Sequence, residues 1–349
     1  MKIPEYEVSI SSLIDKHHES IQSSPRPHMG ASLLGHSCDR WLWLNFRMAV
    51  VEQFPGRILR LFRRGQNEES QVISDLRAIG IDVQKTGNNQ ARVDFGSHVS
   101  GSVDGVIEYG VPGALKTRHV LEIKTHSKKY FDALIKDGVV KAKPMHHIQM
   151  QMYMVGMKLD RALYVAVCKD DDRIYTERVK LDKDVAEKYI ARGHGLALAD
   201  RMPPPLSTDP SWYECKFCAA HEFCHTTNLT KEANCRTCAS STAKEDSTWH
   251  CEQYDVPLTF EQQKTGCEAH ILHPDLVPWK SKYENDNVIW ITPDGDIKNG
   301  IKSKDVFASR EILVNPKACA VNDSFIQMVR QEGGEMVADK DMFEQWVEL

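Results

Sequence analysis

Cysteine placement constrains this chain more than any other feature of its sequence. Ten cysteines occur in 349 residues, and eight of them fall into two spaced sets. Residues 1–7 lack the basic start and apolar stretch of a secretory signal, so we expect the chain to stay in the cytoplasm. A reducing cytosol disfavours disulfides, and we therefore expect these cysteines to bind metal or to react. Cys168 and Cys319 stand apart and are predicted to be small buried side chains.

The first cysteine set joins distant parts of the chain. Cys215, Cys218 and Cys224 provide three thiolates, and the obvious fourth, Cys38, lies far upstream. Four thiolates can hold zinc or an iron–sulfur cluster, and spacing alone does not separate the two. Closing so long a loop removes much chain entropy from the unfolded state, so we expect the role of this metal to be structural.

The second set has the paired and then spaced pattern of a small zinc site. Its members are Cys235, Cys238, Cys251 and Cys267. His250 and His270 lie close enough in sequence to substitute for one of them. Two roles stay open for this region, a structural element that stabilises an acidic appendage and a surface that docks DNA or protein.

Composition favours two globular units without a membrane span. The chain is 41% hydrophobic and 27% charged, and it contains no apolar run of the length a bilayer requires. We place the boundary near Leu229, which gives domains at 1–229 and 230–349. The net charge of −5 conceals an acidic C-terminal part, so the charge allows a basic groove for DNA in the first part and disfavours a DNA surface in the second.

Apolar periodicity predicts an α/β or α+β core in the first part. Helical spacing covers residues 58–79, 144–157 and 184–199. Alternating or β-branched residues predict strands that include 99–108, 118–125, 161–168 and 173–180. Helices therefore precede a meander of strands, which is followed by a helix and two further strands.

One predicted strand carries a chemically unusual triplet. Glu122 and Lys124 should project from one side of it, while Ile123 points into the core and offers its carbonyl. If the strand of Asp104 pairs beside it, two carboxylates and a lysine converge. Such oxygens suit Mg²⁺, and the lysine can orient or deprotonate a water for attack on a phosphodiester. The alternative is a solvated strand face with a weak ion pair.

These residues resemble the PD-(D/E)xK nuclease superfamily, specifically its RecB-like exonuclease branch, over roughly residues 31–226. The resemblance implies a restriction-endonuclease-like core, with a central mixed sheet flanked by helices. It also implies catalytic roles for Asp104, Glu122 and Lys124, with Glu69 helping to hold the metal. The spacing of Gln149 and Tyr153 is similar to the family's Gln-x-x-x-Tyr motif on a helix beside the site. The family often has histidine at the position of Glu69, and a carboxylate there fits Mg²⁺ or Mn²⁺.

The first cysteine set is similar to the iron-staple subgroup of that branch, which includes the AddB nuclease domain and CRISPR-associated exonucleases. In this subgroup one early and three late cysteines hold a [4Fe-4S] cluster, which implies that Cys38, Cys215, Cys218 and Cys224 do so here. The family carries Cys-Pro-Arg at the first position. This chain has Cys38-Asp39-Arg40, which changes the loop more than the ligand.

The leading hypothesis is a metal-dependent DNA exonuclease in recombination, repair or phage DNA processing. The chain has no Walker motif and so no helicase motor of its own, and we expect it to act alone or with a helicase or recombination partner. An endonuclease with the same metal site and a non-catalytic nucleic-acid-binding or assembly factor are the alternatives. The candidates for phosphate contacts are Arg57, Arg60, Arg63, Arg64, Lys128 and Lys129.

Overall fold

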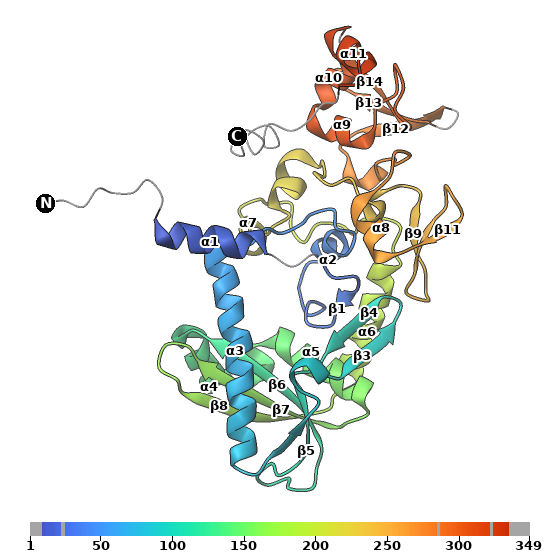
Figure 1. The fold of residues 1–349 in the computed structure, drawn as a ribbon. Coiled ribbons are helices and arrows are strands. Elements are labelled where there is room, and N and C mark those ends of the chain that lie inside the picture. The colour runs from blue at the N-terminus through green and yellow to red at the C-terminus, as the bar shows by residue number, and fades with distance from the viewer. Residues whose placement is uncertain (1–8, 22–24, 285–286, 322–323, 335–349) are drawn as a thin grey trace, which may run out of the picture. The chain divides into compact units, whose positions relative to one another are not determined.

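The computed structural model describes residues 9–21, 25–284, 287–321 and 324–334. The chain forms two compact units, each built from two separate stretches of sequence. The first unit combines Met1–His36 with Glu52–Gly195, and the second combines Ser37–Val51 with Leu196–Leu349. Helices and strands are mixed in the structure (Figure 1), which confirms the α/β class. The boundary near Leu229 stays a prediction.

A five-stranded mixed sheet in the order β2-β5-β6-β7-β8 forms the centre of the first unit. Its strands are β2 (Asp82–Gln84), β5 (Gly105–Tyr109), β6 (His119–His126), β7 (Arg161–Cys168) and β8 (Ile174–Lys180). Strands β6 and β7 run parallel, and the other neighbours are antiparallel. A smaller sheet in the order β1-β4-β3 consists of β1 (Met29–Gly30), β3 (Arg92–Gly96) and β4 (Val99–Ser102).

Helices cover both faces of the larger sheet. The helices of this unit are α1 (Ile10–Ser20), α3 (Gly56–Ala78), α4 (Lys128–Ala142), α5 (Pro144–Met157) and α6 (Lys183–Ala197). Helix α3 buries Val72, Ile73 and Leu76 in one apolar cluster with Leu121 and Ile123 of β6. Side chains alternate along a strand, so the even-numbered residues of β6 project to the opposite face, where α4 and α5 contact β6 and β7.

The single strand predicted over residues 99–108 is wrong. The structure divides it into β4 and β5, which belong to different sheets, and Asp104 lies between them. The carboxylate oxygen Oδ2 of Asp104 accepts a hydrogen bond from the backbone N–H of Ile123 at 2.7 Å. The chain therefore passes from the smaller sheet to the larger sheet at Asp104, whose side chain bonds the central strand β6.

The second unit contains short helices and two small antiparallel sheets. Its helices are α2 (Asp39–Phe46), α7 (Tyr213–Lys216), α8 (Phe260–Thr265), α9 (Ser309–Val314), α10 (Pro316–Val321) and α11 (Ser324–Gln331). One sheet has the order β11-β10-β9, with β9 (Ser241–Ala243), β10 (Trp249–Cys251) and β11 (Val256–Leu258). The other has the order β12-β13-β14, with β12 (Lys280–Glu284), β13 (Asn287–Thr292) and β14 (Gly295–Asn299).

Hydrogen bonds across long sequence separations hold residues 37–51 in the second unit. The indole N–H of Trp43 donates to the carbonyl of Ala199 at 2.9 Å. The Arg236 guanidinium donates to the carbonyl of Phe46 at 2.6 Å, and the Thr230 hydroxyl donates to that of Ala49 at 2.7 Å. Because Trp43 and Arg236 are fully buried, these bonds lie inside the unit.

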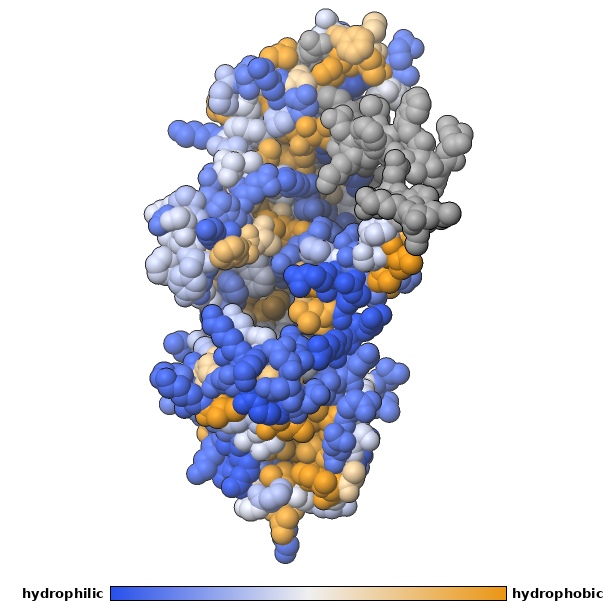
Figure 2. All heavy atoms as spheres, turned by 90° about the vertical axis from the view of Figure 1, so that its left-hand side faces the viewer, coloured by the Kyte–Doolittle hydropathy of each residue, from blue (hydrophilic) through white to orange (hydrophobic). Residues whose placement is uncertain are grey.

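Apolar side chains also reach the surface. Figure 2 shows a mainly hydrophilic face that is interrupted by separate apolar patches. Helix α1 exposes Ile10, Leu13 and Ile14 and buries no residue. No helix in the described ranges combines the length and apolar character needed to cross a membrane.

Candidate active site

The central strand β6 places Glu122 and Lys124 on one face of the larger sheet. The Lys124 ammonium forms an ion pair with Oε1 of Glu122. Glu122 is completely buried, and Ile123 points into the apolar cluster on the other face. This alternation agrees with the orientation expected from the sequence.

Asp104 reaches the same place from the start of the neighbouring strand. Strands β5 and β6 pair with Gly105 opposite Leu121, and Oδ2 of Asp104 lies 4.0 Å from the Lys124 ammonium. The side chains of Lys124 and Asp104 are 27% and 16% exposed, so the site opens to solvent on their side. The structure thus brings Asp104, Glu122 and Lys124 together.

Burial makes a negative charge on Glu122 costly. Desolvation raises the pKa of Glu122 well above its ordinary value, Lys124 offsets part of this effect, and Asp104 adds to it. Burial alone would lower the pKa of Lys124, but Glu122 and Asp104 outweigh it and the pKa is raised. Lys124 compensates the buried carboxylate, and no other group among the described residues donates a hydrogen bond to either oxygen of Glu122.

Glu69 on helix α3 faces the same group of charges. Burial and the nearby Asp104 raise the pKa of Glu69, and the influence of Lys124 partly lowers it. One carboxylate oxygen of Glu69 accepts a hydrogen bond from the Gln90 side-chain amide at 2.9 Å. No sequence pattern selects Gln90, because it lies in a short connection between strands β2 and β3 without a recognisable motif.

Gln149 and Tyr153 lie one turn apart on helix α5, and both are buried. The Gln149 amide nitrogen lies 3.5 Å from the Tyr153 hydroxyl. A Cβ atom at Gly101 of β4 would come within 2.5 Å of that hydroxyl, so only glycine leaves room for Tyr153 there. Gly101 is a site residue that our reading of the sequence overlooked, although a glycine inside a strand often marks such an approach.

The four cysteines of the first set influence one another electrostatically. Burial raises the pKa of Cys218 to about 11, and Cys38, Cys224 and Cys215 contribute in the same direction. Backbone N–H groups approach two of the sulfur atoms, that of Trp41 at 3.4 Å from Cys38 and that of Ala220 at 3.4 Å from Cys218. The upstream cysteine therefore lies in the electrostatic neighbourhood of the three late ones.

The second cysteine set lines one small cavity of about 10 Å³, together with residues that include His270. Burial raises the pKa of Cys235 to about 11, and Cys267, Cys238 and Cys251 add to this shift. As they are placed, no three His, Cys, Asp or Glu side chains of the described residues form a group that could hold a metal ion. The cysteines of each set lie near one another, but they are not arranged as the ligands of a metal ion.

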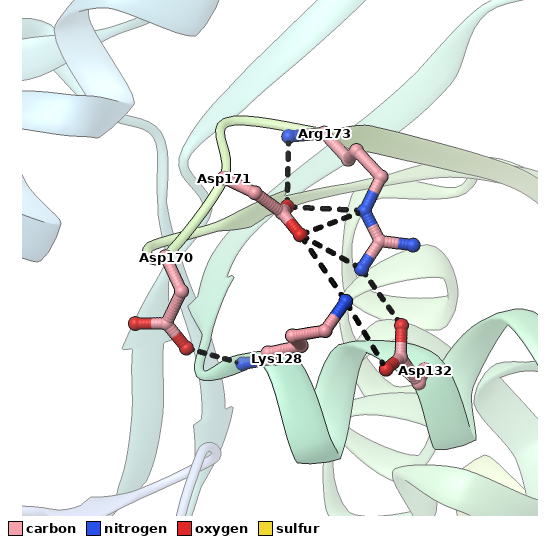
Figure 3. A network of polar contacts seen from close by, with 5 residues as sticks. All are labelled: Lys128, Asp132, Asp170, Asp171 and Arg173. Carbon is pink, nitrogen blue, oxygen red and sulfur yellow. Dashed lines mark hydrogen bonds and ion pairs between the residues drawn. The ribbon is translucent and has the colours of Figure 1, made fainter.

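Lys128 is engaged in an ionic network at the start of helix α4 (Figure 3). Its ammonium lies 3.7 Å from Asp132 and 3.5 Å from Asp171, and its backbone N–H donates to Asp170 at 2.6 Å. Arg173 bonds both Asp132 and Asp171. Lys128 therefore has acidic partners at an exposed position, and the phosphate contact expected from it stays a prediction.

Three of the candidate arginines also have protein partners. Arg60 forms an ion pair with Asp15, Arg64 donates to the carbonyl of Lys169 at 2.7 Å, and the Arg63 guanidinium lies 3.4 Å from Nε2 of His18. The phosphate contacts expected from the four arginines and Lys129 stay predictions.

Two carboxylates and a lysine on a mixed sheet, with a third carboxylate nearby, define a candidate hydrolytic active site. No family model and no curated protein sequence matches the chain. Among solved structures it is similar to SSO0001, with a TM-score of 0.39 and 15% identity over 63% of this chain and 98% of the other.

Two further similar structures are exonucleases. The alkaline exonuclease LHK-Exo from Laribacter hongkongensis has a TM-score of 0.36 and 18% identity, over 52% of this chain and 90% of its own. A phage-related exonuclease from Haemophilus somnus 129PT has a TM-score of 0.27 and 19% identity, over 39% of this chain and 68% of its own. All these TM-scores lie below 0.5, so the function has to be argued from the side chains of this chain.

Proposed function

We propose that this chain is a divalent-metal-dependent DNA exonuclease of the PD-(D/E)xK type, with a restriction-endonuclease-like core. The observation that carries the proposal is the fully buried Glu122, which lies beside Lys124 and close to Asp104. Desolvation of a buried carboxylate costs several kcal/mol, and the ion pair with Lys124 offsets only part of this cost, because the pKa of Glu122 stays raised. Such a carboxylate on a central strand is the feature expected of a metal ligand.

The donor atoms suit Mg²⁺ or Mn²⁺. Carboxylate oxygens of Asp104, Glu122 and Glu69 and the carbonyl of Ile123 would hold the ion, and hard cations prefer such oxygens. Among the described residues, no group other than Lys124 compensates the Glu122 carboxylate, so its oxygens have capacity for a cation. When bound, the metal would supply Lewis-acid stabilisation of a phosphodiester oxygen.

Lys124 would act on the water molecule, and Gln149 and Tyr153 of α5 would act on the substrate. The Lys124 ammonium, held between Glu122 and Asp104, can orient a water molecule toward phosphorus and stabilise developing negative charge. Gln149 and Tyr153 would orient the substrate from the helix above the sheet, since both side chains are buried on the face that carries Glu122. Gly101 leaves the space that the Tyr153 hydroxyl occupies.

We predict that cleavage becomes faster as the pH rises through the neutral range. The pKa of Glu122 is raised, so at lower pH this group binds a proton, and the proton competes with the metal. Initial rates measured from pH 6 to pH 9 should increase, and a higher Mg²⁺ concentration should move the profile toward lower pH. A rate that falls with pH, or a profile that does not respond to Mg²⁺, would contradict this role of Glu122.

We also predict that the protein degrades linear DNA and leaves covalently closed circular DNA intact. The same metal site can serve an exonuclease or an endonuclease, and only the requirement for an end separates the two. Both substrates should be incubated with Mg²⁺ or Mn²⁺ and followed by gel electrophoresis. Conversion of closed circles to nicked or linear forms at a comparable rate would favour the endonuclease instead.

The first cysteine set is proposed to hold a [4Fe-4S] cluster through Cys38, Cys215, Cys218 and Cys224. The mutual effect of these thiols on their pKa values and the two N–H groups near sulfur support this assignment. N–H groups directed at cluster sulfurs are a usual means of tuning such a cofactor. The iron would be structural and would join residues 37–51 to the three late cysteines.

The second set is proposed to hold Zn²⁺ through Cys235, Cys238, Cys251 and Cys267. Their shared cavity and mutual electrostatic influence support a common ligand. Four thiolates around Zn²⁺ make a closed structural site, which would stabilise the small strands β9–β11. Elemental analysis of the purified chain should therefore find zinc as well as iron.

A further inference from the structure

The active-site face of the sheet continues beyond Lys124 into a second polar group. Glu122, Lys124 and His126 alternate along β6 and share one face. Tyr164 of β7 is the register partner of Glu122, and partners in neighbouring strands project to the same side. On the covering helix α5, His146 lies one turn before Gln149, on the same side of the helix.

The hydroxyl of Tyr164 connects two imidazoles. It lies 2.9 Å from Nε2 of His126 and 2.9 Å from Nδ1 of His146. The two rings are stacked, with centroids 5.6 Å apart and an interplanar angle of 17°. Tyr164 is fully buried, so its hydroxyl joins strand β6, strand β7 and helix α5 away from solvent.

Both imidazoles are neutral near pH 7. Burial lowers the pKa of His126 to about 4 and that of His146 to about 3, and nearby Lys143 and Lys124 reinforce both shifts. Lys169 also acts on His126. Neutral imidazole offers one N–H and one acceptor nitrogen, and a tyrosine hydroxyl can donate one bond and accept another. The Tyr164 hydroxyl can thus form hydrogen bonds with both His126 and His146 while neither imidazole places a positive charge beside Lys124.

We propose that Tyr164 is a positioning residue for the reaction, because its bonds to His126 and His146 fix helix α5 over β6 and β7. This inference rests on the proposed nuclease function. Helix α5 carries Gln149 and Tyr153 one and two turns after His146, so a displacement at His146 is transmitted to them. A misplacement of about 1 Å in an active site can cost roughly 10²-fold in rate.

The test compares two conservative substitutions that each remove one hydroxyl. Tyr164→Phe removes both imidazole contacts. Tyr175→Phe removes the bond of a half-buried hydroxyl to Glu177, at 2.7 Å on β8, and serves as the matched control. We expect Tyr164→Phe to lower kcat by about tenfold or more with little change in KM, and the control to keep both values. In hydrogen–deuterium exchange, the amides of α5 should lose protection only in Tyr164→Phe.

A second pair of variants separates positioning from general packing. His146→Asn keeps a side-chain nitrogen or oxygen near the position of Nδ1 and should retain most of the rate, whereas His146→Leu should not. Equal rates in these two variants, or unchanged kcat and α5 protection in Tyr164→Phe, would overturn the inference. If the native chain cleaves no DNA, the nuclease proposal fails, and the exchange measurement alone then decides whether Tyr164 holds α5.

Discussion

Lys124→Ala is expected to lower the rate of DNA cleavage by about 10²- to 10⁴-fold, the usual contribution of a group that transfers or orients a proton. Lys124 supplies the ammonium that pairs with the buried Glu122 and lies 4.0 Å from Asp104. The substitution removes both the positive charge and its donor groups from the centre of the proposed site. Initial rates on end-labelled linear DNA, measured with Mg²⁺ and with Mn²⁺, give the comparison.

The control for this experiment is Lys141→Ala. The Lys141 side chain is 76% exposed and pairs with Asp137 one turn earlier on α4, where a surface pair contributes little to stability. This variant should cleave DNA at the native rate. Thermal melts should accompany both variants, because Lys124→Ala leaves Glu122 buried without its cation. Equal activity in native protein and Lys124→Ala would defeat the proposed mechanism, and DNA binding without any cleavage would favour a non-catalytic binding or assembly factor.

Cys218→Ala is expected to give a colourless and poorly soluble protein. In the proposed cluster this cysteine is one of three late ligands that close a long loop onto Cys38, so its loss returns that loop's entropy to the unfolded chain. Visible absorbance and iron content report the cluster, and a thermal melt reports the stability of the fold. The iron content should fall sharply, while the zinc content per folded chain should stay unchanged.

Cys319→Ala provides the matched control in the same unit. Cys319 is buried in a separate apolar cluster around Trp290 and Phe307, so its truncation should cost stability without loss of colour. A brown and stable Cys218→Ala protein would contradict the assignment of this cysteine. Zinc in place of iron in the native protein would keep the ligand set but change the metal.

The central part of the fold could be predicted because its signals are local. The helix predicted over residues 144–157 coincides with α5, which begins with Pro144 at its first turn, where a missing N–H is tolerated. The strand predicted over residues 161–168 coincides with β7, which is apolar on both faces. Strict alternation along β6 likewise placed Glu122 and Lys124 on one side and Ile123 on the other.

Features that depend on distant parts of the chain were not predictable in this way. The residues of β4 and β5 form one continuous β pattern in the sequence, which hides the break between the two strands. The hydrogen bond from the Ile123 N–H to Asp104 gives a reason for the break, but it joins residues that are distant in sequence. His126, His146 and Tyr164 come from three elements, and no spacing rule connects them. The ion pairs of Lys128 depend equally on the turn after β7, which the sequence pattern does not bring next to the start of α4.

The membership of residues 37–51 in the second unit has a consequence for synthesis of the protein. These residues leave the ribosome early, but their partners Thr230, Asn234 and Arg236 are 181 to 190 positions later in the chain. At about 5–20 residues per second, the nascent segment waits on the order of 10–40 s before it can be covered. The tryptophans of this segment remain accessible to chaperones during that interval. The first unit has to fold while residues 37–51, which interrupt its sequence, are not yet packed.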